Sequence, residues 1–181
     1  YNLTWPGMSG VYTAMAPGRF SAAINQAPMR MHGLSFLGDW AKNRKIVELE
    51  QGIPPAHLLR KVFETCKTYD EAKQMLVETR IALPAIFVLS GMGPGEGCVI
   101  ERLENTAEVA ELGARQQLVA ANHFTSSLTT VGKGWRPREE DSEGRFRQAN
   151  DILGHDMDPA HFEWLRAPII SRRTRLCAVM E

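Results

Sequence analysis

The chain has 181 residues and a mass of 20.2 kDa, which is enough for one compact domain and short for two. Hydrophobic residues make up 44% of it and charged residues 23%, as in average globular proteins, so a disordered or low-complexity chain is excluded. Its 21 basic and 21 acidic residues cancel, and no positive excess directs it to nucleic acid or to an anionic membrane. We expect neither of these partners. A net charge of zero favours self-association and leaves a homo-oligomer open.

The cysteines and the two chain ends bear on the cellular compartment. Cys66, Cys98 and Cys177 lie far apart without a CxxC pair, which argues against disulfides and zinc knuckles and favours the cytoplasm. The longest apolar stretch, residues 81–89, is too short to span a bilayer. The start lacks a signal-peptide pattern and the end follows an apolar run, so we expect a piece of a larger protein. A targeting signal upstream would leave the localisation open.

The first predicted elements are two strands, over residues 11–16 and 20–25. Pro17-Gly18-Arg19 separates them, and Pro-Gly is a turn dipeptide. Two strands joined this tightly must pair in antiparallel fashion. Residues 34–50 mix apolar and charged side chains, which predicts a polar connection that is partly helical.

Two short helices are predicted after the break at Ile53-Pro54-Pro55. Apolar residues recur at helical spacing over residues 55–66 and again over 69–80. Thr68 and Glu71 fit a capping box at the start of the second helix. We expect the two helices to pack together and to cover one face of a sheet. The side chains expected to be largely buried there are Leu59, Val62, Phe63, Met75 and Leu76.

A block of strands follows, over residues 85–89, 98–102 and 117–121. The glycine-rich turn between the first two lacks the Lys-Ser/Thr ending of a phosphate loop, and a strand follows where a helix would be needed. It therefore predicts a hairpin. The last predicted elements are helices over 142–153 and 158–165 and a strand over 174–180. This order indicates α+β layers rather than alternating βαβ units.

The common catalytic and metal-binding motifs are missing from the sequence. The five histidines form no HExxH or other spaced ligand set, and no GxSxG elbow is present. His155 with Asp156 and Asp158 could hold a metal, although a solvated loop is the commoner use of such residues. Cys98 begins a predicted strand, where a thiol is usually a small buried hydrophobe. A thiol hydrolase that uses Cys98 stays as an alternative.

The informative polar residues are two asparagines at predicted strand ends, Asn25 and Asn122. Asparagine is rare in strands, so its presence there needs a reason. One reason is turn formation, because the side chain bonds the nearby backbone. The other is an oxyanion hole, in which a neutral amide donor is aimed at a developing negative charge. The pattern alone leaves both interpretations open.

Four stretches carry a resemblance to a known family. They are LTWPGMSGVYTAMAPGRFSAAINQAP at residues 3–28, PGEGCVIER at 94–102, LVAANHF at 118–124 and DSEGRFRQANDIL at 141–153. Together they resemble the N-terminal nucleophile (Ntn) hydrolases that act on linear amides, nearest to the branch of acid ceramidase and N-acylethanolamine amidase. The resemblance implies a four-layer αββα sandwich. Residues 1–181 are then expected to be a single domain, the C-terminal portion of that fold, incomplete at both ends.

The resemblance also implies roles for three residues. Asn122 falls on the family's oxyanion donor, and Asn25 falls where bile-salt-type members carry an active-site asparagine. Arg145 falls on a late arginine that helps to order the nucleophile pocket, with Arg147 as its competitor. The chain departs from the ceramidase branch in two ways, since that branch varies at the position of Asn25 and has a shorter interval between Asn122 and Arg145.

The family's nucleophile is a cysteine at a mature N-terminus, followed by an arginine and an aspartate. All three precede the matched region, so Cys66, Cys98 and Cys177 cannot take that role. The implied activity is hydrolysis or acyl transfer at the linear C–N bond of a small-molecule N-acyl amide, with no metal or organic cofactor. The alternative is a non-catalytic binding or assembly domain that keeps the same fold. The acyl chain and the amine stay open.

Overall fold

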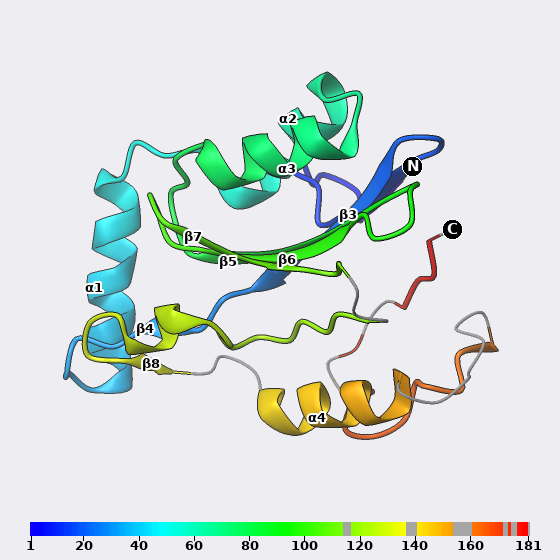
Figure 1. The fold of residues 1–181 in the computed structure, drawn as a ribbon. Helices are drawn as coiled ribbons and strands as arrows, with labels where there is room; N and C mark the ends of the chain where they lie inside the picture. Colours follow the sequence, from blue (N-terminus) through cyan, green and yellow to red (C-terminus); the bar gives the residue numbers. More distant parts are fainter. Residues whose placement is uncertain (114–116, 137–140, 154–160, 172–173, 175–176, 181) are drawn as a thin grey trace.

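The centre of the protein is a six-stranded antiparallel sheet in the order β1-β2-β3-β5-β6-β7 (Figure 1). The computed structural model describes residues 1–113, 117–136, 141–153, 161–171, 174 and 177–180. The strands of the sheet are β1 (Asn2–Leu3), β2 (Thr13–Ala16), β3 (Phe20–Gln26), β5 (Ala85–Gly91), β6 (Gly97–Arg102) and β7 (Ala107–Glu111). A second, two-stranded sheet pairs β4 (Met29–Arg30) with β8 (Trp135–Arg136).

Both predicted hairpins are confirmed. Strands β2 and β3 pair with Ala16 opposite Phe20, and Gly18 in the turn has a φ of 73°, which glycine adopts without strain. Strands β5 and β6 pair up to Ser90 opposite Gly97. The backbone N–H groups of the second turn donate to the carboxylate of Glu96. A turn that already supplies its own acceptor in this way is a hairpin turn rather than a phosphate loop.

Helices α2 (Pro55–Thr65) and α3 (Tyr69–Glu78) lie side by side over one face of the sheet, as predicted (Figure 1). Of the five side chains expected in this layer, Leu59, Val62 and Leu76 are fully buried, whereas Phe63 and Met75 are half-buried. The cap of α3 is also present, because Thr68 Oγ1 accepts the Glu71 N–H at 3.2 Å. The apolar spacing therefore predicted both the helices and the face that they bury.

Helix α1 (Phe36–Leu49) is helical throughout, where the sequence indicated a connection that is only partly helical. Ser35 caps it by accepting the Gly38 N–H at 3.2 Å. One turn later, the buried Asp39 lies 3.7 Å from the guanidinium of Arg136 in β8. This long helix is therefore tied to the small β4–β8 sheet rather than to the central one.

Two of the predicted strands are wrong for the residues that the structure describes. Residues 117–121 run under the sheet without pairing, and residues 174 and 177–180 belong to no strand. Leu118 and Ala120 pack against the face of the sheet opposite α2 and α3 and form no ladder. Strand β7 was not anticipated, since its Ala-Glu-Val-Ala-Glu sequence lacks a strand-like apolar run.

Helix α4 (Ser142–Leu153) is confirmed and lies on the side of the sheet opposite α2 and α3 (Figure 1). The residues 117–134 that precede β8, here called the connecting segment, lie between the sheet and α4. Phe124 and Leu128 of this segment pack against Ile86 and Val99 of the sheet. The order across the molecule is thus a helical layer, the sheet, the connecting segment and α4. The helix predicted over residues 158–165 is wrong for residues 161–165, which form no α-helix, and residues 158–160 lie outside the described residues.

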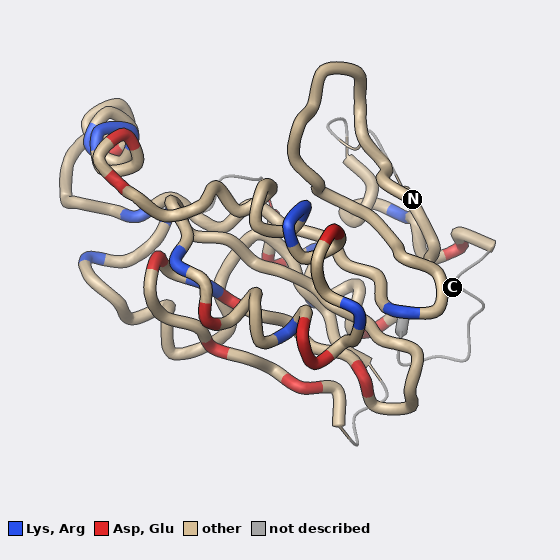
Figure 2. The backbone as a smooth tube through the Cα atoms, turned by 90° about the horizontal axis from the view of Figure 1, so that it is seen from above, with Lys and Arg blue, Asp and Glu red and all other residues tan. Residues whose placement is uncertain are grey.

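Basic and acidic residues are mixed over the molecule. Figure 2 shows the two kinds side by side along the backbone rather than gathered on separate sides. Some of them form ion pairs one helical turn apart, as Arg44 does with Glu48 and Arg60 does with Glu64. Within the described part of the chain, every helix is too short or too polar to cross a membrane.

Candidate functional site

Asn25 ties the central sheet to the segment that carries Asn122. It lies within β3, one residue before the strand ends, rather than in a turn. Its Nδ2 donates to the carbonyl oxygens of Ala120 and Ala121, at 3.2 and 3.3 Å. The amide hydrogens of Asn25 are therefore used to hold the backbone directly before Asn122.

The carboxamide of Asn122 is held at both ends. Its Oδ1 accepts a hydrogen bond from Arg145 Nη2 at 3.0 Å, and its Nδ2 donates to the carbonyl oxygen of Gln26 at 3.0 Å. A guanidinium only donates, so the contact with Arg145 fixes which end of the amide is oxygen. The amide nitrogen carries two hydrogens, and Gln26 is its one acceptor among the described residues. Among those residues, the second hydrogen has no acceptor.

Arg145 and Ser142 reach Asn122 from the first turn of α4. Ser142 is buried, its Oγ accepts the Asn122 N–H at 2.8 Å, and it lies 2.7 Å from His123 Nδ1. Of the two candidate arginines, the structure brings Arg145 to Asn122 and leaves Arg147 exposed. The three residues named from the sequence are therefore brought together from β3, the connecting segment and α4. Their roles in a reaction stay predictions.

A pocket of about 530 Å³ opens beside Asn25 and Asn122. Its walls are mostly apolar, and the rings of Trp5 and Tyr12 stack there with centroids 5.7 Å apart. An apolar pocket with a few converging polar groups is the usual form of a small-molecule site. The residues that line it are Trp5, Met8, Tyr12, Ile24, Asn25, Gln26, Pro54, Pro55, Ala56, His57, Leu83, Pro84, Ala85 and Asn122.

Sequence reasoning missed several residues around this pocket. His57 lies on the pocket wall at the start of α2, with its Nε2 2.9 Å from Ser9 Oγ. Ser142 and Glu101 hold the Asn122 segment from two other elements. Glu101 and Ser142 lie within the stretches that carry the family resemblance, but no local pattern marks any of these residues as part of a site, because their partners lie far away in the chain. Only the folded arrangement identifies them.

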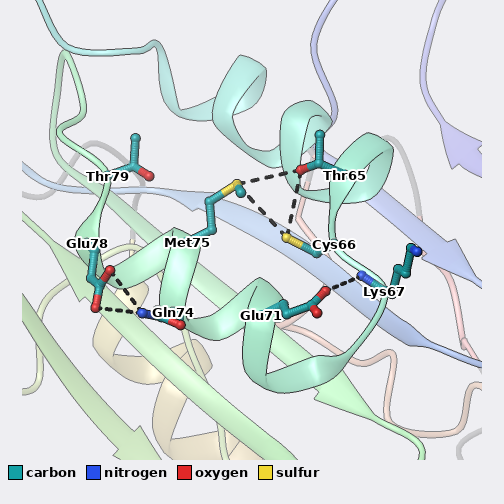
Figure 3. A pocket seen from close by; sticks show the side chains of 8 residues that line it. All are labelled: Thr65, Cys66, Lys67, Glu71, Gln74, Met75, Glu78 and Thr79. Carbon is teal, nitrogen blue, oxygen red and sulfur yellow. Dashed lines mark hydrogen bonds between the residues drawn. The ribbon is translucent and has the colours of Figure 1, made fainter.

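A second hollow of about 530 Å³ lies between the end of α2 and helix α3 (Figure 3). Figure 3 shows its polar groups bonded to one another, as in the contacts of Gln74 with Glu78 and of the Lys67 N–H with Glu71. The sulfur atoms of Cys66 and Met75 are 4.0 Å apart. Burial raises the pKa of the Cys66 thiol, which leaves it a poor nucleophile. This hollow therefore offers no reactive group.

The structure also argues against Cys98 as a nucleophile. Its side chain is 1% exposed within the core between the sheet and α3. Burial raises its pKa, so the thiol form is favoured. Among the described residues, no group of three potential metal ligands is present. The possible metal ligands His155, Asp156 and Asp158 lie outside the described residues.

Comparison with known proteins shows which protein family the sequence matches. Residues 4–130 match the model of the linear amide C–N hydrolases, choloylglycine hydrolase family. The chain is 35% identical to the acid ceramidase of Homo sapiens over 114 residues, which are 62% of this chain and 28% of that protein. It is 34% identical to the acid ceramidase of Mus musculus over 96 residues, 53% of this chain and 23% of the relative. The chain thus spans less than a third of the length of these curated relatives.

A solved structure shares the fold. It is the Caenorhabditis elegans ortholog of the N-acylethanolamine-hydrolyzing acid amidase, which superimposes with a TM-score of 0.69. The match covers 94% of this chain and 69% of the other, at 22% sequence identity. At this identity the likeness shows the fold alone, and it confirms the expected α+β sandwich.

Proposed function

Because the chain belongs to the choloylglycine hydrolase family of linear amide C–N hydrolases, we propose that it contributes to an enzyme that cleaves an N-acyl amide. Residues 1–181 are then one domain, the C-terminal portion of the catalytic fold. The observation that carries the proposal is the carboxamide of Asn122, which Arg145 orients beside an apolar pocket. The similar solved structure is that of an N-acylethanolamine-hydrolyzing acid amidase, which supports an acylated amine as the substrate class.

In the proposed reaction, a cysteine thiolate from a segment upstream of Tyr1 attacks the amide carbonyl carbon. The cysteine's own α-amine takes up the thiol proton. The carbonyl electrons move onto oxygen, and the Nδ2–H of Asn122 donates to that oxyanion. When the oxyanion collapses, the C–N bond breaks and the α-ammonium returns its proton to the leaving amine. Water then hydrolyses the thioester, or a second amine accepts the acyl group.

The contacts around Asn122 suit this role. A donor that is fixed before the reaction stabilises the developing charge without reorganising at the moment of attack. Arg145 holds Oδ1, so Nδ2 is turned the other way, and polarisation by the guanidinium makes the N–H a stronger donor. Asn25 supports the same site by holding the backbone at Ala120 and Ala121.

The test is an assay of the full-length protein against N-acyl amides of graded acyl length. We expect Asn122→Ala to lower kcat about 100- to 1000-fold and to change KM little, because the donor acts mainly in the transition state. Asn150→Ala is the matched control, since among the described residues the side chain of Asn150 bonds only within its own helix, at Phe146 O. Activity that is indifferent to Asn122→Ala would overturn the role of Asn122. A full-length protein that hydrolyses no amide would favour the non-catalytic binding or assembly domain.

A further inference from the structure

One row of side chains crosses four strands of the central sheet. Asn25 in β3 is opposite Ile86 in β5, Ile86 is opposite Glu101 in β6, and Glu101 is opposite Glu108 in β7. Residues directly opposite in antiparallel strands point to the same face. Ile86 packs with Phe124, so this is the face away from α2 and α3. The row therefore faces the segment that carries Asn122.

The polar members of the row hold this segment at successive points. Asn25 donates to the carbonyl oxygens of residues 120 and 121. Glu101 accepts from Thr125 and Ser126, and Glu108 accepts from Ser127 Oγ at 2.9 Å. Asn122 lies between the first and second of these points. Its backbone is thus fixed to the sheet both before and after it.

Glu101 makes the most complete of these attachments. Its side chain is almost fully buried, with 4% exposed. Oε1 accepts the Thr125 N–H at 2.7 Å and the Thr125 Oγ1–H at 2.8 Å, and Oε2 accepts the Ser126 N–H at 3.1 Å and the Ser126 Oγ–H at 2.6 Å. None of the described basic side chains forms an ion pair with it. A buried carboxylate needs such donors, and hydrogen bonds to a charged group are the stronger kind.

We propose that Glu101 is a positioning residue for Asn122. It fixes the backbone three residues after Asn122 and so sets where the Nδ2–H of Asn122 meets the pocket. The inference rests on the proposed function, in which that hydrogen bond stabilises the oxyanion. A fixed donor is needed, because a displacement of about 1 Å at a reacting centre lowers the rate by up to about 100-fold.

The test is a double-mutant cycle in the full-length enzyme, with a fluorogenic N-acyl aminocoumarin as the probe. Glu101→Gln keeps the shape but places an NH₂ group against donors, so we expect kcat to fall about 10- to 100-fold while KM stays nearly constant. In the Asn122→Ala background the same substitution should have little further effect. Glu111→Gln is the matched control, because Glu111 pairs with Lys73 on the opposite face of the sheet.

Hydrogen exchange shows whether Glu101→Gln loosens the segment that follows Asn122. We expect the amides of Thr125 and Ser126 to exchange faster in Glu101→Gln and to stay unchanged in Glu111→Gln. If Glu101→Gln does not fold, the double substitution Thr125→Val with Ser126→Ala replaces Glu101→Gln in the cycle. It removes the two hydroxyl groups that donate to Glu101.

The possible results have distinct meanings. Rate losses that multiply in the double variant, or a Glu101→Gln enzyme with an unchanged kcat, would overturn the inference. If Asn122→Ala alone leaves kcat unchanged, the proposed function fails first, and the exchange data still show whether Glu101 fixes the segment.

Discussion

Several buried or half-buried polar side chains of the described residues hold backbone segments in place. Asn25 donates to two carbonyl oxygens, and Glu101 accepts two backbone N–H groups. Arg102, which is fully buried, donates to the carbonyl oxygens of Leu76 and Thr79 at the end of α3. Burying a polar group is unfavourable unless it is paired, so each of these contacts fixes a segment that apolar packing alone would leave adjustable.

The buried carboxyl of Asp39 makes the stability of the fold depend on pH. Burial by itself would raise its pKa, but the backbone N–H groups of His32 and Leu34, with the positive charge of Arg136, lower it below its ordinary value. A carboxyl whose pKa is lower in the folded state stabilises the fold above its unfolded pKa. That contribution is lost as the pH falls through the folded pKa.

We therefore expect Asp39→Asn to reduce the free energy of unfolding at neutral pH and to reduce it less as the pH falls below about 4. The measurement is urea unfolding of both proteins at a series of pH values from about 3 to 7. Curves of unfolding free energy against pH that run parallel throughout this range would contradict the prediction.

At the scale of elements, helices α2 and α3 pack their apolar faces against the central sheet. Leu58, Leu59 and Val62 of α2 and Ala72 and Leu76 of α3 are all fully buried in one cluster. That cluster also contains residues of β2, β3, β5 and β6. The helix pair and the sheet thus form one core, and each depends on the other.

Truncation in α2 tests this dependence. We expect Leu59→Ala to lower the free energy of unfolding by about 2–5 kcal/mol, because the cavity left in a packed core cannot close fully. Phe63→Ala should have a smaller effect, since Phe63 is half-buried and contacts Phe20 at its edge of the cluster. The measurement is chemical denaturation, and a loss below about 1 kcal/mol for Leu59→Ala would show that the helix pair is peripheral.

At the scale of the whole molecule, the candidate site depends on parts that are distant in the sequence. The pocket takes walls from the first hairpin, the start of α2, the start of β5 and the Asn122 segment. The match to relatives covers 28% of the human acid ceramidase. The proposed nucleophile is expected from a segment that precedes Tyr1. The site is therefore proposed to be complete only in the longer protein.

We accordingly expect residues 1–181 alone to show no amidase activity and the full-length protein to show it. Without a thiolate to attack the carbonyl, Asn122 can bind only a ground-state carbonyl, and the rate hardly changes. The measurement is a parallel assay of the two proteins on the same N-acyl amides, with circular dichroism to check that the shorter chain is folded. Hydrolysis by a folded residue 1–181 chain would contradict the expectation.

The sequence by itself determined the hairpins and helices that depend on residues only a few positions apart. The hairpins at Pro17-Gly18 and at residues 91–97, helices α2, α3 and α4, and the cap at Thr68 depend on neighbours a few positions away. Apolar periodicity and turn chemistry report such neighbours directly. Asn25, Asn122 and Arg145 were also named from the sequence, through short motifs in a recognisable order.

Only the tertiary structure decided how these parts meet. The apolar run over residues 117–121 predicts a strand equally well, but it packs flat under the sheet and is tied down by Asn25. Glu101 and Ser142 lie within the stretches that carry the family resemblance, but their contacts are with residues about twenty positions away or more, which no local pattern indicates. Strand register places Asn25 and Glu101 on one face, and register is a property of the whole sheet. For this reason the pattern of residues indicated the elements, whereas the arrangement around Asn122 required the folded chain.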